Sequence, residues 1–140
     1  PGTPLEHAWA WWLTYAQGIE RPDEASEALA ARPQDAPWSN LYPWMDDGLG
    51  RALWLGGKPT EALPHLESAF KRCDQFATVL SSMRTNLLYG QALEAQRDRA
   101  GACEAYRSIL ARWGKASPRS VTAEAAAKRV QALGCARTPG

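Results

Sequence analysis

Two stretches of the chain carry the same residue pattern at a spacing of 40 positions. The matched pairs are Gly50 with Gly90, Leu53 with Leu93, Gly57 with Arg97, Ala62 with Ala102, Leu66 with Tyr106 and Ala69 with Ile109. Self-similarity at such a period is typical of repeat architectures. Small residues suit the points where two helices approach closely, and bulky residues fill the layers between them. The pattern therefore predicts two units, each made of two antiparallel helices.

Composition supports an all-α fold. Ala, Leu, Glu and Arg dominate the 140 residues, which is the usage of helix formers. The net charge of +1 gives no electrostatic reason to expect nucleic acid or an anionic membrane as a partner. No apolar run approaches the roughly 20 residues that cross a bilayer, so we expect no membrane insertion by this segment. The start at Pro1 and the loose end at Gly140 suggest a segment of a longer protein.

We expect a single domain over 1–140, with five to seven helices in an antiparallel helix-turn-helix solenoid. Its expected parts are a possible divergent first hairpin (1–32), a proline-rich connector (33–43), a repeat (44–73), a second repeat (79–113) and a capping helix (117–134). The first hairpin is suggested by Trp12, which precedes Ala25 by the same 13 residues that separate Leu49 from Ala62. Trp9 and Trp12, three residues apart, are expected in the core.

The residues that recur in the two units resemble the pattern of the tetratricopeptide repeat. Leu49-Gly50 with Gly57, Ala62, Leu66 and Ala69 carry the resemblance in the first unit, and Tyr89-Gly90 with Ala102, Tyr106 and Ile109 carry it in the second. The family's unit is about 34 residues, so the spacing of 40 implies a longer connection, expected around 73–78. Asp46 and Asn86 replace the family's early tryptophan. The resemblance implies a module that binds a protein or peptide.

A second resemblance covers about the last third of the chain. Gly101-Ala102-Cys103-Glu104-Ala105-Tyr106, Arg112-Trp113-Gly114-Lys115-Ala116 and Ala132-Leu133-Gly134-Cys135 look like the C-terminal repeat region of bacterial eukaryotic-like serine/threonine kinases. That resemblance implies a sensor or docking module outside the membrane, with the kinase domain upstream of Pro1. Without it, a cytoplasmic location is expected. Kinase signatures are absent from this segment, so we expect no enzyme here.

The repeat register places one set of residues on the inner face of the array. The candidate partner-binding residues are Trp44, Asp47, Arg51, Trp54, Arg84, Leu87, Gln91 and Glu94. Aromatic residues and arginine are enriched at binding hot spots, so the favoured hypothesis is a groove that holds a peptide or a partner domain. The alternative is a structural domain that self-associates, as a homodimer for example, or packs on a neighbouring domain without a separate ligand.

The three cysteines leave two readings open. In the expected helix order the last helix brings Cys135 beside Cys103, which makes a disulfide between them possible and leaves Cys73 free. Three reduced core cysteines are the other reading. A zinc site lacks the ligand spacing it needs, because no Cys-x-x-Cys occurs and only two histidines are present. No cofactor motif is found either: Pro59 follows Lys58 where a phosphate loop needs Ser or Thr.

Overall fold

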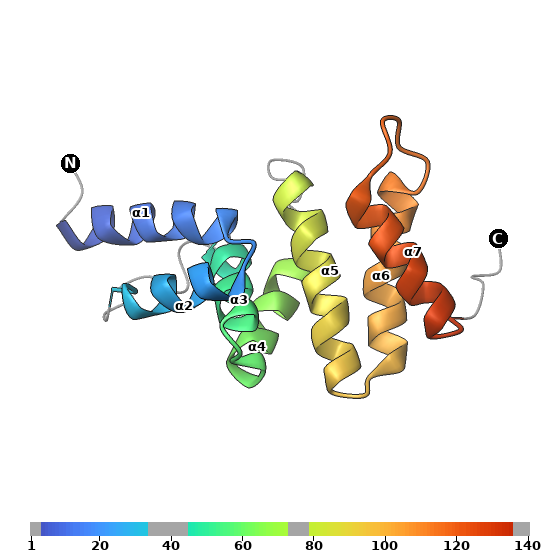
Figure 1. Cartoon of the computed structure of the whole chain (residues 1–140), viewed down its shortest axis with the longest axis horizontal. Helices are drawn as coiled ribbons and strands as arrows, with labels where there is room; N and C mark the ends of the chain where they lie inside the picture. The colour runs from blue at the N-terminus through green and yellow to red at the C-terminus, as the bar shows by residue number, and fades with distance from the viewer. Residues whose placement is uncertain (1–3, 34–44, 73–78, 136–140) are drawn as a thin grey trace.

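The computed structural model describes residues 4–33, 45–72 and 79–135, and these ranges form seven α-helices and no strand (Figure 1). The helices are α1 (Pro4–Gly18), α2 (Pro22–Ala30), α3 (Met45–Leu55), α4 (Pro59–Lys71), α5 (Val79–Ala95), α6 (Arg99–Trp113) and α7 (Val121–Ala132). The prediction of an all-α chain of five to seven helices is confirmed. In the part described, no helix combines the length and the apolar character that a bilayer crossing requires.

The helices pack as a solenoid. α3 packs on α4 and α5 packs on α6, while α4 joins the two pairs through its contact with α5. The first helices of successive pairs also touch: α1 contacts α3, α3 contacts α5, and α5 contacts α7. This pattern of contacts gives an elongated array, with α1 and α2 near one end and α7 at the other (Figure 1).

The 40-residue spacing reappears in three dimensions at two glycines. A Cβ built on Gly50 would lie 2.9 Å from Cδ2 of Leu66, and a Cβ on Gly90 would overlap the ring of Tyr106. Leu66 and Tyr106 are both fully buried. Each pair of helices therefore approaches closely because its first helix carries glycine where its second carries a large side chain.

The turns within the two pairs are also equivalent. Gly57 and Arg97 both have positive φ angles, 76° and 63°. In each turn the next amide donates a 2.9 Å hydrogen bond to the carbonyl five positions earlier, Lys58 to Leu53 and Asp98 to Leu93. This is the Schellman arrangement, in which a left-handed residue ends the helix. The second turn forms without glycine because Arg97 adopts that conformation.

In the first pair of helices, as in the later two, the second helix begins four residues after the last residue of the first helix. α1, α3 and α5 end at Gly18, Leu55 and Ala95, and α2, α4 and α6 begin at Pro22, Pro59 and Arg99. Trp9 and Trp12 lie in the core as expected, and the indole N–H of Trp12 donates a 2.6 Å hydrogen bond to the carbonyl of Ala28 on α2.

One residue sets the first pair apart from the others. Leu13 stands where α3 and α5 carry Gly50 and Gly90. A leucine cannot allow the close approach that these glycines give. α1 and α2 touch each other little, and each of them packs mainly on α3.

The C-terminal end is tied to the array by covalent and polar links. The structure joins Cys103 of α6 to Cys135, just beyond α7, by a disulfide with a Cα–Cα distance of 5.8 Å. Arg99 donates hydrogen bonds to the carbonyls of Leu133 (2.7 Å) and Gly134 (2.8 Å), so it satisfies carbonyls at the end of α7. Cys73 lies outside the described residues.

Candidate functional site

Two arginines from neighbouring inner helices form the centre of the candidate site. Arg51 lies on α3 and is only 7% exposed, whereas the side chain of Arg84 on α5 is about half exposed. Glu20, in the turn between α1 and α2, forms a 3.2 Å ion pair with Arg84. We call Glu20, Arg51 and Arg84 the arginine site.

Arg51 is a buried charge with little compensation. No hydrogen bond or ion pair joins its guanidinium to any residue that the structure describes. Burial lowers the pKa of Arg51, and the positive charge of Arg84 lowers it further, while Glu20 and Asp47 act more weakly in the opposite direction. A largely buried charge without a partner is unfavourable, and the Arg51 nitrogens are not among the fully enclosed unpaired polar atoms, so solvent still reaches the guanidinium.

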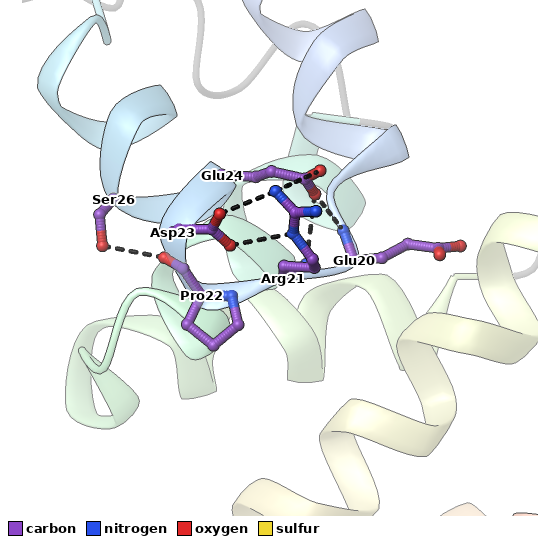
Figure 2. A network of polar contacts seen from close by, with 6 residues as sticks. All are labelled: Glu20, Arg21, Pro22, Asp23, Glu24 and Ser26. Atoms are coloured by element: carbon purple, nitrogen blue, oxygen red, sulfur yellow. Dashed lines mark hydrogen bonds and ion pairs between the residues drawn. The ribbon is translucent and has the colours of Figure 1, made fainter.

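The turn that carries Glu20 is held by its own hydrogen bonds (Figure 2). The carboxylate of Glu24 accepts hydrogen bonds from the amides of Glu20 (3.1 Å) and Arg21 (3.3 Å), as in a capping box at the start of α2. Asp23 binds the side chain of Arg21 through two further hydrogen bonds. Figure 2 shows the side chain of Glu20 directed away from this cluster, which leaves it to Arg84.

Three more of the predicted residues lie at intermediate depth. Trp54 and Leu87 are partly buried and pack against the core, and Gln91 is half-buried on α5. These residues come from the same two inner helices as the arginines. Trp44 lies outside the described residues.

Asp47 is not on the groove surface, where the repeat register places it. It is 2% exposed, and its Oδ2 accepts a 2.8 Å hydrogen bond from Arg72. Burial raises the pKa of Asp47, although Arg72 partly opposes that effect. Arg72, at the end of α4, and Thr85 of α5 both hydrogen-bond its carboxylate, so Asp47 is an internal link.

Glu94 is also committed to an internal contact. Arg129 of α7 donates to both of its carboxylate oxygens, one of them at 2.9 Å, and the hydroxyl of Tyr106 donates to it at 2.5 Å. The hydrogen bond from Arg129 lowers the pKa of Glu94. Burial and the neighbouring Glu94 carboxylate raise the pKa of the Tyr106 phenol. The capping helix thus occupies this end of the inner face, a contact that the two-unit pattern could not reveal.

A contact that the sequence analysis did not anticipate joins α3 to α4. Asp46 Oδ1 lies 2.7 Å from Nδ1 of His65, and the hydroxyl of Ser68 donates a 2.5 Å hydrogen bond to Asp46 Oδ2. These hydrogen bonds, which outweigh the effect of burial, lower the pKa of Asp46. Ser68 bonds the carboxylate rather than the imidazole, so this is not the relay that activates a serine nucleophile. Across the described ranges, no three potential ligands cluster to hold a metal ion.

The fold defines an all-helical, solenoid-like chain with a capping helix. No protein-family model, curated protein or solved structure matches it.

Proposed function

We propose that the chain is a tetratricopeptide-like interaction module that binds an acidic segment of a partner protein at the arginine site. One observation carries the proposal: Arg51 is 93% buried and has no hydrogen bond or ion pair to the residues described. The equivalent helix pairs and turns support the repeat class. The origin in a bacterial kinase stays a prediction.

The chemistry of the site favours a carboxylate. Guanidinium groups bind carboxylates through paired, charge-assisted hydrogen bonds. Two arginines from adjacent helices can share one carboxylate or bind two neighbouring ones. Trp54 and Leu87, on the same helices, offer apolar surface to the rest of a bound peptide.

Glu20 acts as an internal competitor in this proposal. Its carboxylate is paired with Arg84 at 3.2 Å, but both side chains are largely exposed, at 63% and 48%. Exposed pairs of this kind contribute little stability, so an incoming carboxylate can displace Glu20 at a small cost.

The test is calorimetric titration with tetraglutamate, and with tetraglutamine as the uncharged probe. We expect tetraglutamate to bind and tetraglutamine not to bind. Arg51→Gln should weaken that binding about tenfold or more, because a charge-assisted hydrogen bond is lost. Arg84→Gln should also weaken the binding of tetraglutamate. Because the Arg84 side chain is about half exposed, its replacement does not threaten the fold. Glu20→Gln should tighten binding by about two- to fivefold.

The matched control is Glu61→Gln, which removes an equally exposed carboxylate from α4. We expect it to leave the affinity for tetraglutamate unchanged. Equal binding of tetraglutamate by the native chain, Arg84→Gln and Glu20→Gln would reject the arginine site. Circular dichroism of each variant checks that the helices are retained.

A further inference from the structure

A second site lies between α1 and α2, at the opposite end of the array from α7. A shallow hollow of about 380 Å³ is lined by Trp11, Trp12, Tyr15, Glu27, Ala28 and Ala31. Three of these six residues are aromatic. Trp11 is 79% exposed and Tyr15 is 49% exposed, which is unusual for large apolar side chains.

The hollow exists because the first helix pair is splayed. α1 carries Leu13 where the later pairs carry glycine, and α1 and α2 touch each other less than the two helices of each later pair do. Trp12 closes the inner side of the gap, and its position is fixed by the hydrogen bond to Ala28 and by edge contact with Trp9 at 5.6 Å between ring centroids. The aromatic wall is therefore preorganised on one side.

The charged side chains within α1 and α2 are carboxylates, and Arg21 and Arg32 flank α2 at its two ends. α1 and α2 contain no lysine or arginine, although the whole chain has 16. Glu27 lines the hollow, and its carboxylate has no hydrogen bond or ion pair within the described part of the chain. Arg21 interacts electrostatically with Glu27, but its guanidinium is hydrogen-bonded to Asp23.

We propose that this hollow binds a quaternary ammonium group. Aromatic faces attract cations through their quadrupoles, and Glu27 adds a full negative charge at the rim. The chain already uses such a contact nearby, where the guanidinium carbon of Arg32 lies 5.8 Å from the ring centroid of Trp9.

The lining discriminates between kinds of cation. A primary ammonium or a guanidinium brings three to five N–H donors that need acceptors when water is removed. Glu27 and the Tyr15 hydroxyl are the side-chain acceptors of this lining, since the rest is tryptophan and alanine and the Trp12 indole nitrogen is a donor already in use. A quaternary ammonium has no N–H donor to satisfy, so it suits this lining better.

The experiment titrates the whole chain with choline and follows tryptophan fluorescence and calorimetric heat. The neutral probe is 3,3-dimethylbutan-1-ol, which has the same shape without the charge. We expect choline to bind and the alcohol not to bind. Trp11→Ala should weaken choline binding about tenfold or more, and Glu27→Gln about fivefold, because each removes one attractive element. Trp11 is too exposed for its loss to threaten the fold.

Two further probes and a control variant sharpen the outcome. Guanidinium should bind more weakly than choline, and phosphocholine should also bind more weakly because Glu27 repels its phosphate. Glu61→Gln serves as the control variant for general charge effects. The proposal is overturned if the alcohol binds as well as choline, if guanidinium or phosphocholine binds more tightly, or if Trp11→Ala instead dissociates a dimer in sedimentation. In the last case a second copy of the chain covers the hollow.

Discussion

Arg97 shows how a single residue can keep the form of a repeat after its sequence has changed. Its φ of 63° lies in the left-handed region that favours glycine. The equivalent residue of the first turn is Gly57, with φ 76°. An arginine at this position costs roughly 1–2 kcal/mol relative to a right-handed backbone. The hydrogen bonds of the turn and the packing of α5 on α6 offset that cost.

Arg97→Gly should therefore stabilise the protein by about 0.5–1 kcal/mol, the steric relief being partly offset by the greater freedom of glycine in the unfolded chain. Urea denaturation measures the difference. The reverse change, Gly57→Ala, should destabilise by a similar amount, since nothing lies within 4 Å of its added Cβ and only the backbone strain remains. If both variants shift stability in the same direction, the two turns are not equivalent.

The depth of each residue was harder to predict than its position in the repeat. The small and large residues at 40-residue spacing identified the helix pairs because close packing demands such residues at fixed places. The register predicts Asp47 on the groove surface, whereas it is 2% exposed, since burial depends on where α4 and α5 lie. The internal roles of Asp47 and Glu94 depend on partners 25 and 35 residues away, Arg72 and Arg129. A pattern within one unit does not contain that information.

At the scale of elements, one polar cluster connects the last three helices. Glu94 of α5 receives hydrogen bonds from Tyr106 of α6 and from Arg129 of α7. Its side chain is 17% exposed, while that of Arg129 is 43% exposed. The cluster therefore lies at the edge of the core, where water partly screens it. It supplements the apolar contacts of α7, whose buried residues are only alanines, Ala123 and Ala126.

Glu94→Gln should destabilise the protein by about 1 kcal/mol at neutral pH, because the charge-assisted hydrogen bonds become neutral ones. The pKa of Glu94 is lower in the folded chain than in the unfolded chain. The stabilisation that Glu94 contributes is thus fully present above its pKa in the unfolded chain and is lost as the pH falls through its pKa in the folded chain. Urea titrations between pH 7 and pH 3 measure the free energy of unfolding. The difference between Glu94→Gln and the native protein should disappear below about pH 4.5. The control is Glu104→Gln, at an exposed position on α6, which should have the same free energy of unfolding as the native protein across this pH range.

At the scale of the whole molecule, the helices form a row in which each pair contacts mainly its neighbours. In such arrays stability is close to a sum of local terms and interfaces between adjacent units. The arginine site draws on the α1–α2 turn, α3 and α5, whereas the disulfide and the Glu94 cluster lie at the α6–α7 end. A change at one end should accordingly be felt most strongly at that end.

The disulfide offers a test of this independence. Its loss, by reduction or in the double variant Cys103→Ser with Cys135→Ser, should lower stability by about 3–4 kcal/mol for a sequence separation of 32 residues. Hydrogen exchange under native conditions should then show faster exchange in α6 and α7, with α1 and α2 unchanged. Addition of reductant to the double variant controls for effects elsewhere in the chain. An equal loss of protection in all helices would mean that the row unfolds as one cooperative unit, because only local openings can leave the far end protected.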